Sequence, residues 1–449
     1  MKYDCIVIGG GASGVMAALS VRRHYPDFKI LLLEKEFQLL RKVKASGNGR
    51  CNLSNRNIKS DNYFSLQSGK SAKQKFLQTA FNIFSYPDTV EFFGSLGIPL
   101  RLDQSDRAYP YSEQASSVVL TLTQALSETK IDVLLQAKVS RIKSLDNFIE
   151  LTVEPFKTVK EKRHFAYLTS AQTFQCEKLI VACGSKAAEN LGGTDSGYQL
   201  LEEYATISEL RPGLVPLNLI MDEKAKLLVG QRFKGSAKLL LNNTILAQSS
   251  GEFLFVENGL SGIAAMELAR FLPQADQANQ DDNSNKANKA TKARKGTKDI
   301  IDTKDRRDIE DIIVELDFVP DYQLSEIEEY LINRRKILSE QKQKFSAVGI
   351  VKENISDYLV QRAGTIKNLA SLMKSTSFIV DGSKGFSAAQ ITVGGVCLSQ
   401  IWMPSLALKS QPNIYVCGEL IDIDGKTGGF NLQWAWTSGF IAGQLRDSF

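Results

Sequence analysis

The stretch 4-DCIVIGGGASGVMAALS-20 constrains the fold of this chain more than any other part of the sequence. It reads as a short buried strand, a glycine turn and a helix, with Gly9, Gly11 and Gly14 in the spacing GxGxxG. The first glycine permits the tight turn, the second lets the backbone approach a pyrophosphate, and the third lets the helix pack close to the strand. The pattern therefore predicts a dinucleotide-binding fold.

Two neighbouring features support this prediction. The helix begins near Ala12 and Ser13, and its N-terminus offers unpaired N–H groups and a positive dipole end to phosphates. A second strand, 29-KILLLEK-35, ends in Glu34, twenty residues after Gly14. A carboxylate at that position accepts hydrogen bonds from the adenosine ribose and repels a 2′-phosphate. We therefore expect the ligand to be FAD or NAD.

Length and composition indicate a soluble globular protein of more than one domain. The chain has 449 residues, of which 43% are hydrophobic and 23% are charged. No run approaches the roughly 18 apolar residues of a membrane span, and the N-terminus lacks the apolar core of a signal peptide, so we expect a cytoplasmic protein with no membrane partner. Six cysteines without paired spacing and only two histidines predict reduced thiols and no metal site.

The rest of the chain favours FAD over NAD. No second GxGxxG follows a strand, so there is no separate nicotinamide-nucleotide fold. Two later segments return to the first domain: 178-KLIVACGSKA-187, a strand ending in a glycine turn, and 412–443, a strand, a glycine loop and a helix. We expect Glu419 to hydrogen-bond the ribityl chain. The Gly428-Gly429 turn would aim the helix N-terminus at the flavin ring, where it stabilises negative charge.

Four segments resemble one known family. They are VIGGGASG at 7–14, KASGNGRCNLSN at 44–55, GGV at 394–396 and GELIDIDGKTGGFNLQWAW at 418–436. The set is similar to the bacterial NAD(P)/FAD-dependent oxidoreductases of the BaiN/RdsA type, the HI0933-like flavoprotein family. The resemblance covers nearly the full length apart from 274–308, and GNGRCN with GGFNLQWAW is far more specific than the glycine fingerprint.

The resemblance implies an α/β fold with a Rossmann-like, glutathione-reductase-like FAD-binding domain, an inserted β-rich domain and a small helical domain. It implies an FAD-dependent oxidoreductase that reduces an activated C=C bond, with NAD(P)H as the transient electron donor. Family members have been linked to bile-acid intermediates and to dihydrouridine in ribosomal RNA, so the resemblance implies the reaction class rather than the substrate. Three alternatives stay open: uridine in ribosomal RNA, a small conjugated enone, and a flavin-bound interaction protein without turnover.

The chain departs from the family pattern in three places. The segment 255-FVENGLSG-262 lacks the Thr-His that usually precedes the Gly-Leu-Ser-Gly turn, and Ile263 replaces a proline. The segment 184-GSKAAENLGGTDSGY-198 is also altered. A role assigned to that histidine has no counterpart here, which leaves room for a shift in substrate specificity.

The expected FAD-binding domain comprises 1–196 and 376–449, followed in the middle by a β-rich insertion at 197–345 and a helical segment at 346–375. The polar tract 274–308 is expected to be disordered, because its composition cannot bury a core. Its basic part, 286–298, is read as a solvated loop, with weak RNA contact as the alternative. The net charge of +5 is compatible with an RNA partner without indicating one.

Periodicity predicts further elements in the middle and at the end of the chain. Expected strands lie at 148–153, 164–170 and 173–177, as an antiparallel meander, and at 214–221, 238–248, 252–257 and 312–320. Expected helices lie at 262–272, 323–341 and 354–374, and a closing helix starts at about Asn431 with Trp434 and Trp436 packed in the core.

The loop 45-ASGNGRCNLSN-55 carries the main catalytic candidates. Cys51 is the first candidate for a proton donor, and the neighbouring Arg50 could lower the thiol pKa and bind an oxygen or phosphate of the substrate. The alternative is that Cys51 is a small packed residue. Gly47 and Gly49 would permit close approach of the backbone to the cofactor.

Tyr109 and water are the other candidate proton donors. The resemblance suggests that Arg107, Tyr109 and Ser112 form a turn close to the flavin or substrate. The alternative is a helix start in which Ser112 is the N-cap of a helix whose apolar face is Val118, Leu122 and Ala125.

Motifs and resemblance together predict a set of cofactor contacts on both chain ends. They are Gly9, Gly11, Ala12, Ser13, Gly14, Glu34, Lys35, Lys42, Ser46, Gly47, Asn48, Gly49, Arg50, Cys51, Asn52, Gly184, Gly418, Glu419, Gly428, Gly429, Phe430, Asn431 and Leu432. The expected catalytic residues are Cys51, Arg50 and Tyr109.

Overall fold

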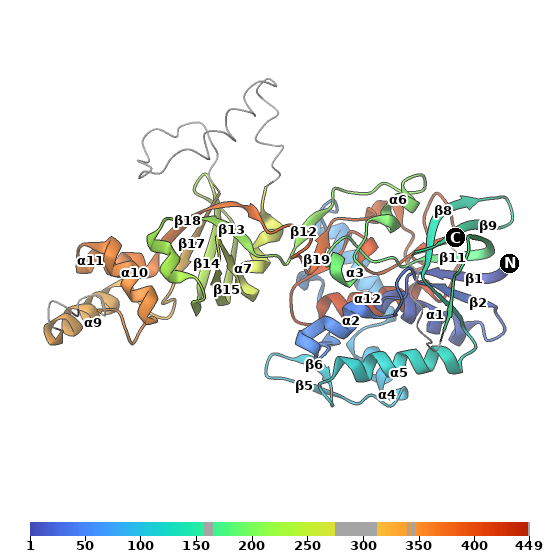
Figure 1. Ribbon diagram of the computed structural model, residues 1–449, viewed down its shortest axis with the longest axis horizontal. Coiled ribbons are helices and arrows are strands. Elements are labelled where there is room, and N and C mark those ends of the chain that lie inside the picture. The colour runs from blue at the N-terminus through green and yellow to red at the C-terminus, as the bar shows by residue number, and fades with distance from the viewer. Residues whose placement is uncertain (157–164, 274–311, 339–341, 343–345, 448–449) are drawn as a thin grey trace, which may run out of the picture. The chain divides into compact units, whose positions relative to one another are not determined.

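A computed structural model of the protein describes residues 1–156, 165–273, 312–338, 342 and 346–447 (Figure 1). The chain forms two compact units: unit 1 is Met1–Gly213 with Gly385–Phe449, and unit 2 is Leu214–Lys384. The tract 274–308, with its basic part 286–298, lies outside the described residues.

The unit boundaries differ from the expected domain bounds at both joins. Residues 197–213 lie in unit 1, where β12 (Arg211–Gly213) pairs with β19 (Ile391–Val393). Residues 376–384 lie in unit 2, because β18 (Thr376–Ser383) completes its barrel. Long-range strand pairing decides these positions, and sequence periodicity carries no signal for it.

Unit 1 is built on an eight-stranded sheet in which the two ends of the chain meet. Its strands in spatial order are β10 (Ala166–Tyr167), β7 (Asp132–Leu135), β2 (Ile30–Leu33), β1 (Lys2–Ile8), β11 (Gln172–Val181), β9 (Ile149–Pro155) and β8 (Ala137–Ser144), and β20 (Ile414–Val416) also pairs with β11. The pairs from β10 to β11 and the pair β11–β20 are parallel, whereas β11, β9 and β8 form an antiparallel extension. The parallel part is the Rossmann-type layer predicted from the glycine turn.

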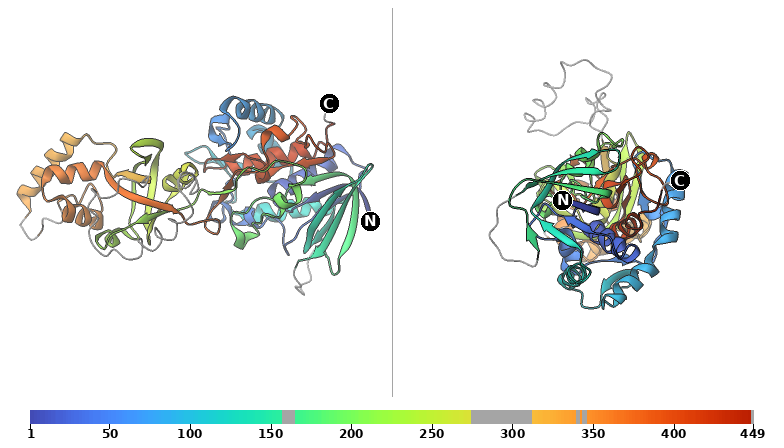
Figure 2. Two further views of the ribbon diagram at one scale, coloured as in Figure 1. Left: turned by 90° about the horizontal axis from the view of Figure 1, so that it is seen from above. Right: turned by 90° about the vertical axis from the view of Figure 1, so that its right-hand side faces the viewer.

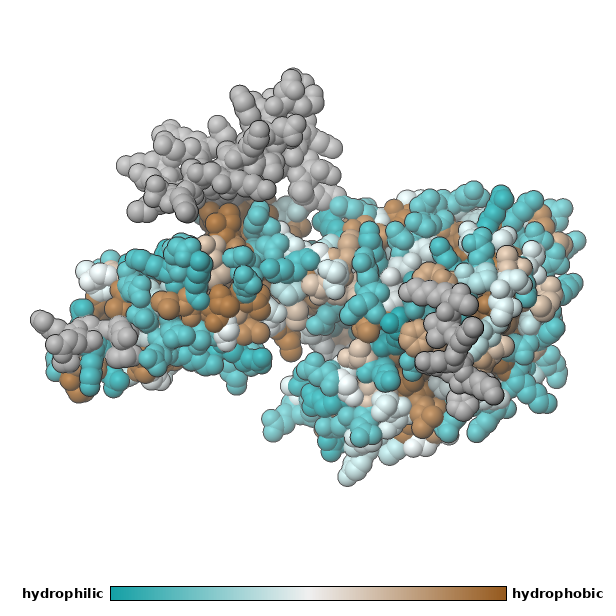
Figure 3. Space-filling view, in the orientation of Figure 1, coloured by the Kyte–Doolittle hydropathy of each residue, from teal (hydrophilic) through white to brown (hydrophobic). Residues whose placement is uncertain are grey.

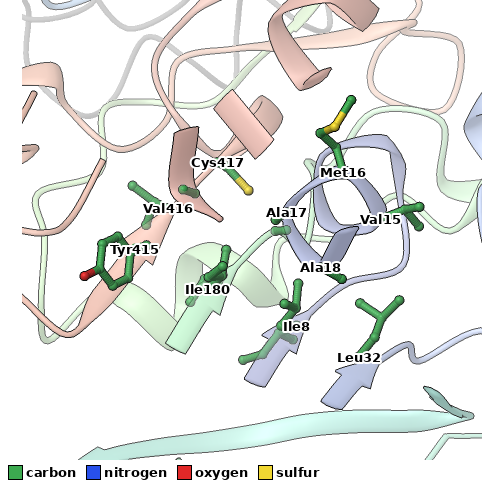
Figure 4. Packing of buried hydrophobic residues seen from close by; sticks show 14 of the residues in the cluster. Ile8, Val15, Met16, Ala17, Ala18, Leu32, Ile180, Tyr415, Val416 and Cys417 are labelled. Carbon is green, nitrogen blue, oxygen red and sulfur yellow. The ribbon is translucent and has the colours of Figure 1, made fainter. Parts of the chain in front are cut away.

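Helix α1 (Ala12–His24) packs on this sheet, and α12 (Phe430–Ala442), from the other end of the chain, packs on α1. Figure 4 shows Ala17 of α1 beside Ile8 of β1 and close to Ile180 of β11. The two helices approach closely because Gly439 of α12 and its C-cap, Gly443, lie at the contact. A Cβ at Gly439 would stand 2.3 Å from the Ser13 carbonyl oxygen.

Smaller elements surround this layer. The helices are α2 (Arg41–Ala45), α3 (Lys70–Ile83), α4 (Tyr86–Ser95), α5 (Ala115–Glu128) and α6 (Ser196–Leu201). Two small sheets, with orders β3-β6-β5 and β21-β4, comprise β3 (Ser54–Asn55), β6 (Arg107–Pro110), β5 (Leu100–Leu102), β21 (Asp424–Gly425) and β4 (Tyr63–Phe64). In Figure 2 the antiparallel strands β8, β9 and β11 extend away from the helices of unit 1.

Unit 2 contains a closed barrel and a group of helices. The barrel strands in order are β13 (Leu217–Ile220), β16 (Gly259–Ser261), β15 (Thr244–Val256), β14 (Arg232–Leu241), β17 (Ile312–Asp317) and β18. Phe233 stacks on Phe253 and Phe255 in its core, with ring centroids 5.1 and 5.7 Å apart. The helices are α7 (Ile263–Leu268), α9 (Leu324–Ile337), α10 (Glu353–Ala363) and α11 (Ile366–Lys374).

The fold class expected from the sequence is confirmed, and several element predictions are corrected. The strand at 164–170 is only β10, which pairs with β7 rather than joining the meander, because the parallel edge offers it a partner. The helix at 354–374 is two helices, α10 and α11, separated at Gly364 by a backbone with φ 65°. The expected helix at 323–341 is present as α9 (Leu324–Ile337) in the part of that range that the structure describes.

The N-cap prediction for Ser112 is wrong. β6 occupies Arg107–Pro110, and α5 starts later, with Gln114 as its N-cap, so Ser112 lies between the two elements and is exposed. The predicted apolar face of the helix, Val118, Leu122 and Ala125, is buried as expected.

Hydrophilic residues dominate the face of the molecule seen in Figure 3, with scattered hydrophobic side chains among them. None of the helices in the described ranges combines the length and apolarity needed to cross a lipid bilayer.

Candidate functional site

The glycine loop has the geometry that its spacing predicts. Gly9 has a φ of 106°, and a Cβ on Gly14 would stand 1.8 Å from the Gly9 carbonyl oxygen. A Cβ on Gly11 would meet nothing within 4 Å, so the loop is open where a pyrophosphate is expected to approach. Gly11 is the N-cap of α1, and the first-turn amides that include Ala12 and Ser13 have no acceptor within the helix.

Glu34 follows β2 and faces the glycine loop. One carboxylate oxygen accepts from the Gly10 amide at 2.6 Å, and the other accepts from the Glu36 amide at 2.7 Å. Burial raises the pKa of Glu34, and the two backbone hydrogen bonds only partly offset that rise. A carboxylate has further lone pairs, so Glu34 can still accept from ribose hydroxyls.

Two other predicted contacts lie at the ends of strands in the same layer. Lys35 is partly buried, its Nζ lies 5.4 Å from the centroid of the Phe156 ring, and burial lowers the pKa of its amine. Gly184 follows β11 with a φ of 72°, and a Cβ there would meet nothing within 4 Å. The space beside Gly184 is therefore open to a ligand.

The loop Ser46–Asn52 winds tightly between α2 and β3. Gly47, Asn48 and Gly49 all have positive φ, at 57°, 55° and 81°. The Arg50 amide donates to the Gly47 carbonyl oxygen at 3.2 Å, which closes the turn. Left-handed backbone at three successive residues explains why glycine and asparagine occupy these positions.

This loop meets the glycine turn from the other end of the chain. With its amide oriented to satisfy both partners, Asn52 accepts from the Gly429 amide at 3.0 Å. Asn55 Nδ2 donates to the Gly428 carbonyl oxygen at 3.0 Å, and a Cβ on Gly429 would stand 2.3 Å from the Ser54 carbonyl oxygen. The GNGRCN loop and the GGFNLQ turn, which lie far apart in the sequence, therefore meet in unit 1.

Helix α12 begins at Phe430, with Gly429 as its N-cap, so its first-turn amides lie at this meeting point. Asn431 turns away: its side chain accepts from the Gly425 amide at 2.7 Å and donates to the Gly425 carbonyl oxygen at 2.9 Å. Phe430 is buried, whereas Leu432 is partly exposed. The side chain of Asn431 thus shapes the adjoining loop, and its backbone amide belongs to the helix N-terminus.

Trp434 and Trp436 are buried in the core, as expected. The indole of Trp434 donates to the Gly418 carbonyl oxygen and that of Trp436 donates to the Leu53 carbonyl oxygen, each at 3.1 Å. The two tryptophans therefore brace α12 against the loops at either side of the meeting point.

Glu419 is held by two partners from distant parts of unit 1. One oxygen accepts from the Thr392 amide at 2.8 Å, and the other lies 3.4 Å from Lys42 Nζ. Gly418 packs against Ser13, since a Cβ there would stand 2.3 Å from the Ser13 hydroxyl oxygen. Glu419, Lys42 and the start of α1 therefore come together. Thr392 was not singled out from the sequence, where its one signal is a position just before the GGV motif.

The structure corrects the expectation for Cys51. Its side chain is fully buried, and burial raises the pKa of the thiol to about 12, with a hydrogen bond from Ser46 working in the opposite direction. Arg50 points elsewhere, with its guanidinium 4.9 Å from the centroid of the Tyr109 ring. The expected lowering of the thiol pKa by Arg50 is therefore wrong, and the packed-residue reading of Cys51 fits the site.

All six cysteines lie in described residues and are free of disulfides. Within the described ranges, no group of three or more His, Cys, Asp or Glu side chains has the arrangement of a metal site.

The residues present fit FAD. The open loop at Gly11 suits a pyrophosphate, Glu34 suits the ribose, and the α12 N-terminus lies where both chain ends meet. A parallel Rossmann layer that carries these three features is typical of FAD-dependent oxidoreductases, and this chain is one of that flavoprotein class. The chain belongs to the HI0933-like protein Rossmann domain family, whose model matches residues 3–445.

Two curated relatives and a solved structure resemble the chain. The 3-dehydro-bile acid delta(4,6)-reductase of Clostridium scindens is 28% identical, over 98% of this chain and 97% of that protein. The ribosomal RNA dihydrouridine synthase of Escherichia coli strain K12 is 24% identical, over 99% of this chain and 98% of that protein. The open conformation of a flavocytochrome c3 fumarate reductase aligns with a TM-score of 0.45 and 14% identity, over 99% of this chain and 78% of that chain.

Proposed function

We propose that this protein reduces an activated carbon–carbon double bond by two electrons, with NAD(P)H as the ultimate donor. The observation that carries the proposal is the convergence of the GNGRCN loop, the Gly428-Gly429 turn and the α12 N-terminus at one place in unit 1. FAD, when bound there, would take electrons from NAD(P)H and supply a hydride to the substrate. The names of both curated relatives describe reactions that saturate a double bond conjugated to a carbonyl group.

The residues of this chain take distinct roles in the proposal. Gly11 and the α1 N-terminus would hold the pyrophosphate of FAD, and Glu34 would accept hydrogen bonds from its ribose. The α12 N-terminus stabilises negative charge on the group that lies against it. Arg50 would bind an oxygen of the substrate. A water would deliver the proton, because the Cys51 thiol has a pKa near 12 and Tyr109, at 3% exposed, is nearly as buried as that thiol.

The first substrate proposal is uridine in ribosomal RNA, on the ground that the dihydrouridine synthase relative aligns over nearly the whole of both chains. The second is a small conjugated enone of steroid type, on the ground of the higher identity to the bile-acid reductase. The two substrates share the chemistry at the double bond and differ in everything around it.

A deletion strain and the purified protein test the proposal. Mass spectrometry of ribosomal RNA is expected to show loss of one dihydrouridine on deletion and its return with the wild-type gene. Unchanged RNA excludes the first substrate. Acceptor-dependent oxidation of NADH or NADPH by the FAD-loaded protein, with a uridine-containing RNA or a 3-dehydro bile acid as acceptor, tests the reaction class. No turnover with any unsaturated acceptor would favour a flavin-bound interaction protein.

A further inference from the structure

One face of a small sheet in unit 1 gathers arginines around a tyrosine. In the sheet β3-β6-β5, Arg101 lies opposite Tyr109, and Asn55 lies opposite Arg107. Because side chains alternate along a strand, these four residues share one face. Ser54 and Ala108 lie on the other face and are fully buried. In Figure 1, β5 and β6 lie beside α5.

Two guanidinium groups on this face are joined by one carboxylate. Glu113 pairs with Arg101 through one oxygen, and its other oxygen lies 4.0 Å from the Arg50 guanidinium. Arg50 also covers the Tyr109 ring at 4.9 Å, which leaves Tyr109 only 3% exposed. Glu113 holds a left-handed backbone with a φ of 49°, an unusual conformation for a glutamate.

The same face borders the proposed flavin site. Asn55 donates to the Gly428 carbonyl oxygen, and Cδ of Arg107 would lie 3.9 Å from a Cβ on Gly428. On the other side, Cε1 of Tyr109 would lie 3.6 Å from a Cβ on Gly47. Arg107 therefore stands beside the Gly428-Gly429 turn, and Tyr109, which Arg50 covers, stands beside the Gly47 loop.

The local sequence is strongly basic. Residues 41–59 contain six lysines and arginines and no aspartate or glutamate, in a chain whose net charge is only +5. Lys44, Arg50, Arg56 and Lys59 in this stretch are exposed. Acidic partners from other segments pair with four of the six, among them Glu113 with Arg50 and Asp106 with Arg56. The basic groups of this stretch are therefore held by carboxylates that it does not itself supply.

We infer that Arg50 and Arg101 form a binding site for an anionic group of the substrate, a phosphate or a carboxylate, and that Glu113 occupies this site when the substrate is absent. The inference rests on the proposed function, because it assigns a substrate contact to the same site. It adds Arg101 and Glu113 to the residues that the sequence singled out.

The ion pairs of Glu113 with Arg50 and Arg101 are weak enough for an anionic ligand to displace them. The side chains of Arg50, Arg101 and Glu113 are 47%, 45% and 34% exposed, and ion pairs with that exposure to water contribute little to stability. A phosphate or carboxylate bound bidentately by a guanidinium makes shorter, charge-assisted hydrogen bonds. The substrate can therefore displace Glu113 at small cost, whereas a neutral substrate has nothing to gain from the two arginines.

The test measures binding to the full-length, FAD-loaded protein. The probes are a fluorescein-labelled uridine-containing RNA of 12 nucleotides, read by anisotropy, and a 3-dehydro bile acid with its methyl ester, read by the change in flavin absorbance. Arg101→Ala is expected to weaken binding of the anionic probe about tenfold, the usual scale for a lost charged hydrogen bond. Glu113→Gln is expected to tighten it several-fold, because the competing charge is gone.

The control is Arg141→Ala, which removes an exposed arginine of β8 far along the sequence from this face and is expected to leave affinity unchanged. If the Arg101→Ala and Glu113→Gln substitutions change the affinity for RNA but not for the bile acid, the anion is a phosphate. Effects on the free bile acid, absent for its methyl ester, identify it as a carboxylate. Equal affinities of wild type, Arg101→Ala and Glu113→Gln for both probes overturn the inference, as does an equal loss with Arg141→Ala.

Failure of this inference can be told apart from failure of the proposed function. Oxidation of NAD(P)H with ferricyanide, measured on the wild-type protein, reports electron transfer without the substrate. If that reaction is present while the variants bind like wild type, only the anion site is wrong. If it is absent, the proposed function fails whatever the binding data show.

Discussion

Glu34 illustrates how a single side chain serves both the fold and the proposed ligand. Its carboxylate accepts hydrogen bonds from the Gly10 amide in the glycine loop and from the Glu36 amide beyond its own strand. Burial raises the pKa of this carboxyl group. The carboxylate therefore holds the loop in the shape that a dinucleotide needs, while its remaining lone pairs point to a ribose partner.

We expect Glu34→Ala to weaken FAD binding by about 10- to 100-fold, the range for loss of a hydrogen bond to a charged group. Fluorescence titration of the apoprotein with FAD measures the affinity. Because the pKa of Glu34 is raised, its carboxylate takes up a proton at a higher pH than an exposed glutamate, so wild-type affinity should fall as the pH drops through that raised value. An unchanged affinity in Glu34→Ala would remove the ribose contact from the proposal.

Cys51 supplies the second prediction at this scale. Its thiol is buried, and its pKa near 12 keeps it protonated at neutral pH. Cys51→Ala should therefore retain turnover within a few-fold and lose about 1 kcal/mol of stability, a typical cost of a core substitution. Steady-state rates with NAD(P)H and thermal melts check both parts. A folded, FAD-containing Cys51→Ala protein without turnover would restore the thiol as the proton donor.

At the scale of elements, two glycines at the start of α1 have different roles: one allows close packing and the other leaves space for a ligand. Gly14 has no room for a side chain because of the Gly9 carbonyl oxygen, whereas Gly11 faces open space. The two glycines belong to one motif, yet only Gly14 is required by packing, whereas Gly11 borders the space expected for the pyrophosphate.

Substitution of these two glycines should affect different properties of the protein. Gly14→Ala forces a Cβ to 1.8 Å from a carbonyl oxygen and should destabilise unit 1 by several kcal/mol, at the upper end for overpacking. Gly11→Ala should fold with near-wild-type stability but bind FAD more weakly, because its methyl group enters the space for the pyrophosphate. Urea unfolding and FAD titration measure the two quantities. Equal stability of the two variants would contradict this assignment.

At the scale of the whole molecule, the chain is two units with separate cores. Unit 2, Leu214–Lys384, is continuous in sequence and closes its barrel within itself, with Phe253, Phe255 and Val314 fully buried. Unit 1 is built from both chain ends and holds every cysteine.

We therefore expect a fragment of residues 214–384 to fold alone and to bind no FAD. Circular dichroism with a cooperative urea transition would show folding, and the absence of flavin absorbance after mixing would show the lack of binding. A fragment without a cooperative transition would mean that the barrel depends on unit 1.

Alkaline pH should destabilise unit 1 through its buried thiols. Burial raises the pKa of Cys176, Cys183 and Cys417 to about 12, above the usual value of 9.0. The stability that each contributes is fully present below the unfolded pKa and is lost as the pH rises through the folded one. The free energy of unfolding should fall above pH 9 by up to about 1.4 kcal/mol per thiol per pH unit. Urea unfolding under reducing conditions measures it, and Cys417→Ala should show a shallower decline.

The sequence predicted the parts of this fold that depend on short-range patterns. The Gly9–Gly14 spacing and Glu34 predicted the dinucleotide layer. The alternative in which Ser112 is the N-cap of α5 is wrong, because Arg107–Pro110 form β6, which pairs with β3 and β5, and α5 begins only after Gln114. Pairing between distant strands leaves no local trace, so it could not be foreseen.

The candidate site shows the same division. The sequence by itself determined three features: an FAD-type glycine loop, an acidic residue after the second strand and a glycine turn before the last helix. Each of them can be read from a few adjacent residues. Only the tertiary structure decided that Cys51 turns into the core, that Arg50 turns onto Tyr109, and that Glu113 reaches both Arg50 and Arg101. The direction of a side chain depends on what packs around it, and those neighbours come from parts of the chain far apart in sequence.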